Sequence, residues 1–175
     1  GVNAITKMSK LIDALDTEFR ELLVEVGGVD ETLQHSTLNI SMINGGTRSN
    51  IVPNRCTLRL DIRTTPQLHA HIGALKLLTE FIHRHDPEAE VAMFSDAPPL
   101  NTPGDSPFVQ KLVDCGADLT GAPWFCDAAY LAEAGMPAIA IGPGSIAQAH
   151  TKDEWIATDD LQAGVAFFQR WLQSL

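Results

Sequence analysis

The change from helical to strand periodicity within residues 1–94 is the feature that most constrains the fold. Residues 3–26 carry apolar side chains at steps of three and four, which predicts one amphipathic helix that ends at Gly27-Gly28. Apolar and polar residues then alternate at 38–42 and 58–62, which predicts two half-buried strands separated by a loop. The side chains predicted to face the core are Ile5, Met8, Ile12, Leu15, Phe19, Leu22 and Val26 of the helix and Leu38, Ile40, Met42, Leu58, Leu60 and Ile62 of the strands.

A second helix is expected between Pro66 and Asp86, and a short strand at 90–94. The predicted buried face of this helix consists of Leu68, Ile72, Leu75, Leu78 and Ile82. The order helix, strand, strand, helix, strand is typical of a ferredoxin-like α/β sandwich that lacks its first strand.

Four prolines within residues 95–107 predict a domain boundary, which divides the chain into domains 1–96 and 97–175. The second domain is expected to contain helices at 108–118, 127–134 and 158–175. It should also contain short strands around Trp124-Phe125 and at 136–141. Strands that alternate with helices indicate parallel βα units, so the predicted class is α/β throughout. The two strands predicted in the second domain make a thin sheet, and this segment looks like part of a larger layer.

Charge and composition exclude several classes of function. The net charge of −10 argues against a nucleic-acid partner, because phosphates would be repelled. No apolar run approaches the roughly 20 residues of a membrane span, and no signal peptide opens the chain. Three cysteines without a close pair are typical of a reducing compartment. These features favour a cytoplasmic protein.

One histidine, His150, is placed differently from the others. The second helix region contains His69, His71, His83 and His85. The members of each pair are two residues apart rather than four, which predicts a solvated helix face. His150 instead follows the predicted strand 136–141 and a Gly-Pro-Gly turn, at the strand end where open α/β sheets gather ligands. It is a candidate metal ligand or acid–base residue, although a solvated loop residue is the alternative. One histidine does not make a metal site, which needs three or four ligands.

Three motifs in order carry a family resemblance. They are "GVNAI" at residues 1–5, "GGTRSNIVPNRCTLRLDIR" at 45–63 and "FCDAAYLAEAGMPAIAIGPGSIAQAHTKDEW" at 125–155. Together they resemble the dizinc amidohydrolase family that includes acetylornithine deacetylase, succinyl-diaminopimelate desuccinylase, aminoacylase and glutamate carboxypeptidase. Within that family, "GPGSIAQAH" followed by an acidic pair and an aromatic is most similar to the acetylornithine deacetylases.

The resemblance implies how the two domains are organised. Residues 1–96 resemble most of the lid, the dimerisation domain through which these enzymes form homodimers, without its first strand. Residues 97–175 resemble the last quarter of the catalytic domain. The family's upstream His-x-Asp motif, bridging aspartate and Glu-Glu pair have no counterpart here. The resemblance therefore predicts a C-terminal fragment that is inactive by itself, with its general base expected upstream.

The resemblance also implies four site residues. His150 matches a ligand of the second zinc, Asn50 matches a lid residue that contacts the substrate, and Arg63 matches the arginine that binds the substrate's carboxylate. Phe125 opens the segment that aligns with a Gly-Thr-Asp-Ala substrate motif. From the residues alone, Asn50 is better explained as a turn residue and Arg63 as one of several charges on a polar sheet face.

The activity implied for the intact enzyme is metal-assisted amide hydrolysis, with two zinc ions per subunit and cobalt as a possible substitute. The implied substrate is a small N-acyl amino acid, first N-acetylornithine, which would give ornithine and acetate. Succinyl-diaminopimelate or another N-acyl amino acid or peptide is the alternative substrate. A dimerisation module without catalytic function is the alternative from another class.

Overall fold

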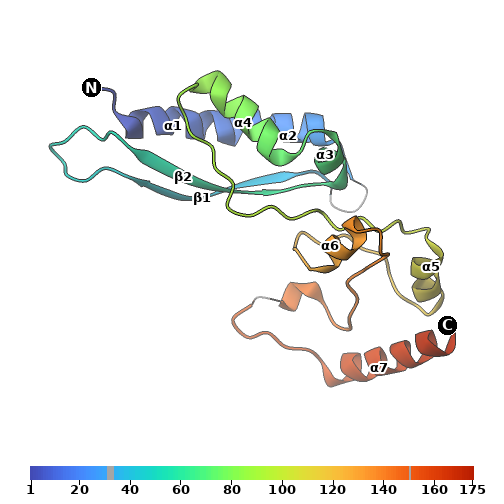
Figure 1. The fold of residues 1–175 in the computed structure, drawn as a ribbon. Coiled ribbons are helices and arrows are strands. Elements are labelled where there is room, and N and C mark those ends of the chain that lie inside the picture. The colour runs from blue at the N-terminus through green and yellow to red at the C-terminus, as the bar shows by residue number, and fades with distance from the viewer. Residues whose placement is uncertain (31–33, 150) are drawn as a thin grey trace. The chain divides into compact units, whose positions relative to one another are not determined.

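The computed structural model describes residues 1–30, 34–149 and 151–175. Within it the chain forms two compact units (Figure 1). The first comprises Gly1–Pro99 with Gly121–Trp124, and the second comprises Leu100–Thr120 with Phe125–Leu175. No helix in the described ranges is long and apolar enough to cross a membrane.

The first unit opens with the predicted helix, which contains a wider turn in its middle. Helix α1 (Ala4–Ala14), the π-helical turn η1 (Leu15–Phe19) and helix α2 (Arg20–Gly27) follow one another without a break. The Asn3 side chain caps α1 by accepting hydrogen bonds from the backbone N–H groups of Ile5 and Thr6 at 3.0 and 3.1 Å.

The π turn fits the spacing of the buried residues. Leu11, Leu15, Phe19 and Leu23 are four residues apart and all buried. In an ordinary helix each such step drifts by about 40° around the axis, because a turn takes only 3.6 residues. A π turn holds more residues and so offsets that drift. The predicted stripe is confirmed at Leu15 and Phe19, whereas Ile5 is 39% exposed.

Strands β1 (Thr37–Gly45) and β2 (Cys56–Arg63) form an antiparallel pair whose register pairs Leu38 with Ile62 and Ile40 with Leu60. A bulge at Ser41 then shifts the register, so that Met42 lies opposite Arg59. The Ser41 hydroxyl donates to the Arg59 carbonyl oxygen at 3.1 Å within this irregularity. The prediction that Met42 faces the core is therefore wrong. One extra residue turns its side chain to the other face, where it is 61% exposed.

The predicted second helix is in fact two helices, α3 (Pro66–His71) and α4 (Ala74–His85). Gly73, with a φ of 76°, separates them in a conformation that favours glycine. The break changes the phase of the helical face, so Leu77 and Phe81 are buried whereas Leu75 is 39% exposed. The prediction for Leu75 is wrong because it assumed one uninterrupted helical period.

The core of the first unit lies between the helices and one face of the hairpin. Figure 1 shows α1, α2 and α4 along the same face of β1 and β2. Phe19 and Phe81 meet there with ring centroids 5.0 Å apart. The side chains that β2 turns toward this core are Leu58, Leu60 and Ile62. The unit is thus the α/β arrangement predicted, with one face of the sheet covered.

A buried polar cluster fixes the ends of four elements to one another. The Thr65 hydroxyl donates to the Gly27 carbonyl oxygen at 3.1 Å, and the Thr65 backbone N–H donates to Ser36 Oγ at 2.9 Å. Thr65 Oγ1 also accepts from the Leu68 backbone N–H at 3.3 Å, which caps α3. Ser36 and Thr65 are 3% and 1% exposed, so water does not compete for these hydrogen bonds.

The strand predicted at 90–94 does not form in the described chain. Ala89 and Val91 still pack against the core, but Phe94 is 84% exposed. A strand exists only through hydrogen bonds to a neighbour, and the described sheet contains only β1 and β2. Local composition predicted a strand here without identifying such a neighbour.

The second unit consists of helices and irregular segments: α5 (Pro107–Asp114), α6 (Ala128–Glu133), the 3₁₀ turn η2 (Ile146–Gln148) and α7 (Thr158–Gln173). All three predicted helices are confirmed, although α5 is shorter than predicted. The strands predicted at Trp124-Phe125 and 136–141 do not form among the described residues. The Thr102 hydroxyl instead contacts both the N–H and the carbonyl oxygen of Ala138, in place of a neighbouring strand.

Candidate functional site

The charged residues of the sheet all lie on the face that the helices leave open. Along β2, Arg59, Asp61 and Arg63 are exposed and alternate with the core-facing residues. Strand β1 contributes no charged residue to either face. Two arginines and one aspartate give this open face a net charge of +1 in a chain of net charge −10. The open face therefore attracts anionic groups locally.

Arg63 is held by a neighbour on the same strand. Its Nε–H donates to Asp61 Oδ2 at 2.8 Å, and the two side chains are 51% and 49% exposed. Within the described residues, its Nη nitrogens make no further hydrogen bond or ion pair. Arg63 pairs across the sheet with Thr37, which is uncharged. The guanidinium is thus fixed at one edge and open to solvent at the other.

Arg59 lies at the other end of the same row. Its Cζ lies 5.0 Å from the centroid of the Phe94 ring, a cation–π contact. At an exposed position such a contact contributes about 0.5–1 kcal/mol. Arg59 and Arg63 therefore differ in their neighbours: an aromatic ring for the first and a carboxylate for the second.

Asn50 lies at the opposite end of the hairpin from Arg63. It is exposed, in the loop that follows the last strand pair, Gly45 with Cys56. The Ala4 backbone N–H donates to the Pro53 carbonyl oxygen at 2.9 Å, which ties this loop to the start of α1. Seven residue steps along β2 separate Cys56 from Arg63, a span of about 23 Å. Asn50 and Arg63 of one chain are therefore not brought together.

The other two predicted site residues belong to the segment 125–155. Phe125 is 43% exposed and makes an edge-on contact with Tyr130 of α6, with centroids 5.5 Å apart. His150 lies outside the described residues. The turn before it is packed on both sides: a Cβ on Gly164 of α7 would lie 2.8 Å from Pro143, and one on Gly144 would lie 3.2 Å from Ile156.

Metal-ligating side chains do not gather in the part of the chain that the structure describes. No three or more His, Cys, Asp or Glu side chains among those residues could hold a metal ion together. The exposed histidines of α3 and α4 are consistent with this finding, and His83 Nε2 is within 3.0 Å of the Ala89 carbonyl oxygen. The described residues by themselves do not fit a metal centre.

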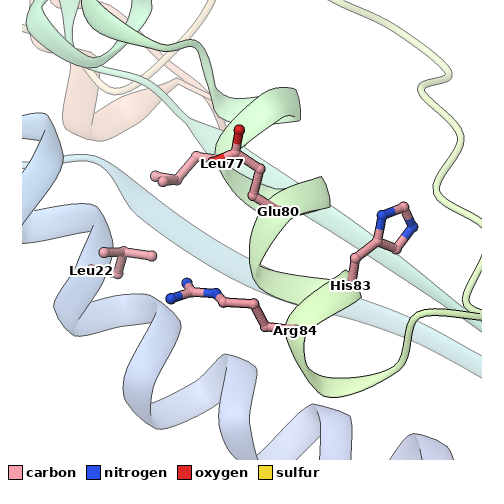
Figure 2. A pocket seen from close by; sticks show the side chains of 5 residues that line it. All are labelled: Leu22, Leu77, Glu80, His83 and Arg84. Atoms are coloured by element: carbon pink, nitrogen blue, oxygen red, sulfur yellow. The ribbon is translucent and has the colours of Figure 1, made fainter.

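A groove between α2 and α4 lies in the helical layer, across the sheet from the charged row. It is lined by Leu22 of α2 and by Leu77, Glu80, His83 and Arg84 of α4. Figure 2 shows Arg84 directed toward Leu22 while His83 points away from it. The Arg84 guanidinium is also 5.5 Å from the Phe81 ring. These charged groups are arranged as on a solvated helix face, which is the predicted environment for His83.

Comparison with family models identifies the first unit. Residues 1–90 match the model described as the peptidase dimerisation domain of the M20 peptidases. The match covers half of the chain, and the chain belongs to this family.

Curated relatives extend the similarity over nearly the whole chain. The acetylornithine deacetylase of Aliivibrio fischeri (strain MJ11) is 32% identical over 165 residues, which are 90% of this chain and 43% of the relative. The acetylornithine deacetylase of Klebsiella pneumoniae (strain 342) is 32% identical over 168 residues, 90% of this chain and 42% of the relative. That of Buchnera aphidicola is 29% identical over 161 residues, 89% and 42% respectively. The chain thus spans less than half the length of these relatives.

Two features of this unit do not follow from the sequence patterns. One is Asp61 as the partner of Arg63, although the "LDIR" motif places both residues two apart on one strand face. The other is the cluster of Ser36 and Thr65, whose contact joins positions 29 residues apart and leaves no local signal.

Proposed function

We propose that the whole protein hydrolyses the amide bond of an N-acyl amino acid, and that residues 1–96 form the lid through which it dimerises. Residues 97–175 would then belong to its catalytic domain, in the cytoplasm. The observation that carries this proposal is the open, positively charged row on β2 in a peptidase dimerisation domain. The names of the curated relatives support the deacetylase assignment.

Arg63 would bind the substrate's α-carboxylate. A guanidinium can donate two parallel hydrogen bonds to one carboxylate, which gives both charge and direction. Arg63 has the exposure for this role, and its Nη nitrogens make no bond to another described residue. Its position at the end of β2 is stable, because the buried Thr65 follows two residues later.

The distance along the hairpin supports a homodimer as the working form. Asn50 and Arg63 are separated by at least the length of β2, about 23 Å, which exceeds the reach of a small amino acid derivative. If both contact one substrate, they come from different subunits. A two-fold dimer through this domain would supply Arg63 from one lid and Asn50 from the other.

Zinc enters the proposal through the family resemblance, with two ions per subunit and His150 as one ligand. Zinc sites need three or four ligands, so most of them would come from elsewhere in the whole protein. When bound, zinc would supply an activated water at neutral pH. The contribution proposed for the described residues is binding and orientation of the substrate.

N-acetylornithine is the first substrate to test, followed by succinyl-diaminopimelate and other N-acyl amino acids. Amine release from each by the whole protein tests the proposal, and no release from any of them with zinc or cobalt supplied would refute it. Arg63→Ala should raise KM for N-acetylornithine at a cost of about 2–4 kcal/mol, but should have much less effect on its α-carboxamide. Arg59→Ala is the matched control on the same strand. Equal losses for acid and amide would refute the carboxylate role of Arg63.

A further inference from the structure

We infer that Asp61 is a positioning residue for Arg63, which it holds so that the Nη1–Nη2 edge of the guanidinium faces the substrate's carboxylate. This inference rests on the role proposed for Arg63. It assigns to Asp61 a function of its own: selecting which edge of the guanidinium is offered and fixing its direction before the substrate arrives.

The geometry of the pair places both side chains on one face of β2. Asp61 and Arg63 are two residues apart on β2, so both project from the open face of the sheet. The Nε–H of Arg63 donates to Asp61 Oδ2 at 2.8 Å, the length of a good charge-assisted hydrogen bond. Across the sheet, Asp61 pairs with Asn39 and Arg63 with Thr37, so no second charge competes from β1.

The hydrogen bond to Asp61 determines which donors of the Arg63 guanidinium remain for the substrate. A guanidinium can meet a carboxylate in a bidentate manner either through Nε and one Nη or through both Nη nitrogens. Because Asp61 occupies Nε, the first of these arrangements is blocked. The end-on arrangement through Nη1 and Nη2 remains, and it points away from Asp61.

The negative charge of Asp61 also acts on the substrate, because two carboxylates repel one another. Both side chains are about half exposed, so water and salt weaken the repulsion between two carboxylates on opposite edges of the guanidinium. The flexibility of arginine has the opposite effect on the comparison. A free arginine loses much side-chain entropy when a ligand orders it. With Nε already bound, part of that ordering has taken place before binding. Positioning should therefore outweigh repulsion.

Three variants of the whole protein separate these effects. Asp61→Ala removes the acceptor, and KM for an N-acetyl amino acid should rise about fivefold with kcat unchanged, as expected for an exposed pair. Asp61→Asn keeps an oxygen acceptor for Nε without the charge, and its KM should stay near that of the wild type. Asp16→Ala is the matched control, because Asp16 accepts from Arg20 Nε at the same 2.8 Å on the helical layer. For the α-carboxamide substrate, none of the three should change KM.

A direct measurement on Arg63 tests the inference independently of turnover. In ¹⁵N-resolved NMR spectra, N-acetylglycine should shift the guanidinium signals of Arg63 in the wild type and in Asp61→Asn. Asp61→Ala should need about fivefold more ligand for the same shift. Equal titrations of wild type and Asp61→Ala, or no shift of Arg63 in the wild type, would overturn the inference. If amine release fails while these titrations differ as expected, only the proposed hydrolysis is refuted.

Discussion

The hydroxyl of Thr65 donates to the carbonyl oxygen of Gly27 at 3.1 Å, which joins the end of α2 to the start of α3 across 38 positions of sequence. Thr65→Ala removes this bond and the cap of α3. The loss in the free energy of unfolding should be about 2 kcal/mol, from a lost cap and an unsatisfied buried carbonyl. Chemical denaturation of the wild type and the variant measures it.

Two further substitutions at the same position separate hydrogen bonding from packing. Thr65→Ser keeps the hydroxyl and should lose less than half as much stability as Thr65→Ala. Thr65→Val keeps the shape but not the hydroxyl, and should lose most of the stability that the alanine variant loses, because the same hydrogen bonds are gone. A valine variant as stable as the wild type would show that packing alone accounts for the buried position of Thr65.

A second prediction concerns the ion pair between the start of α1 and the end of α4. Lys7 Nζ donates to Asp86 Oδ1 at 2.9 Å, and this hydrogen bond raises the pKa of Lys7 above 10.5 and lowers that of Asp86 below 3.8. The ion pair should stabilise the fold at pH values between 3.8 and 10.5. Its contribution should fade as the pH falls through the lowered pKa of Asp86 or rises through the raised pKa of Lys7.

Melting curves of the wild type and Asp86→Asn across this pH range test the sign of the effect. The difference in Tm should be present at neutral pH and absent at low pH, where both proteins carry an uncharged group. Salt should reduce it, because both side chains remain partly exposed. Glu88→Gln is the control, since Glu88 is 89% exposed and lies 3.6 Å from Lys7, and it should have a smaller effect. A difference in Tm that does not vary with pH would contradict the assignment.

Gly164 is the subject of the third prediction. In the middle of a helix, Gly→Ala usually stabilises by about 1 kcal/mol. A Cβ at Gly164, however, would lie 2.8 Å from Cγ and 2.9 Å from Cβ of the Pro143 ring, which is rigid. Gly164→Ala should therefore destabilise the protein, and it should cost less in a Pro143→Gly background, which removes both of these ring atoms. If Gly164→Ala alone raises Tm, then α7 is not packed against the loop at Pro143.

Local periodicity predicted the helices and the hairpin, because each depends on residues within a few positions. It failed where the outcome depends on distant residues. The alternation continues through Ser41 and predicts a core position for Met42, yet a bulge reverses the face. The segments 90–94 and 136–141 have strand-like composition but no neighbouring strand among the described residues.

In the candidate site too, local sequence predicts some features, whereas others depend on distant residues. That Arg59, Asp61 and Arg63 share a face follows from the period of a strand. That Asp61 binds Arg63 while Phe94 packs on Arg59 depends on side-chain conformations and on a segment 35 positions away from Arg59, which a strand pattern does not contain. The roles of Asn50 and Phe125 rest on the family resemblance, and that of His150 rests on the resemblance together with its place after the predicted strand 136–141; all three stay predictions.

The fourth prediction concerns His150 in the whole protein. His150→Ala should remove about one zinc per chain, since a site with a missing ligand binds weakly, and should lower kcat by orders of magnitude. His83→Ala is the control, because His83 lies on the helical layer, where its Nε2 contacts the Ala89 carbonyl oxygen. Elemental analysis of the three proteins provides the measurement. An unchanged zinc content in His150→Ala would show that His150 is a solvated loop residue and not a zinc ligand.

The fifth prediction follows from the separation of Asn50 and Arg63. If each site takes Arg63 from one subunit and Asn50 from the other, two different defects can complement one another. In a hybrid of Asn50→Ala and Arg63→Ala subunits, one of the two sites would have both residues intact, while the other would have lost both.

Amine release by mixed Asn50→Ala and Arg63→Ala proteins, after subunit exchange, tests this account most directly. Each variant alone should be nearly inactive on N-acetylornithine. Random exchange makes about half of the dimers hybrids, so the mixture should recover about a quarter of the wild-type activity. A mixture that exchanges subunits but stays as inactive as the separate variants would contradict a substrate site shared between two lids.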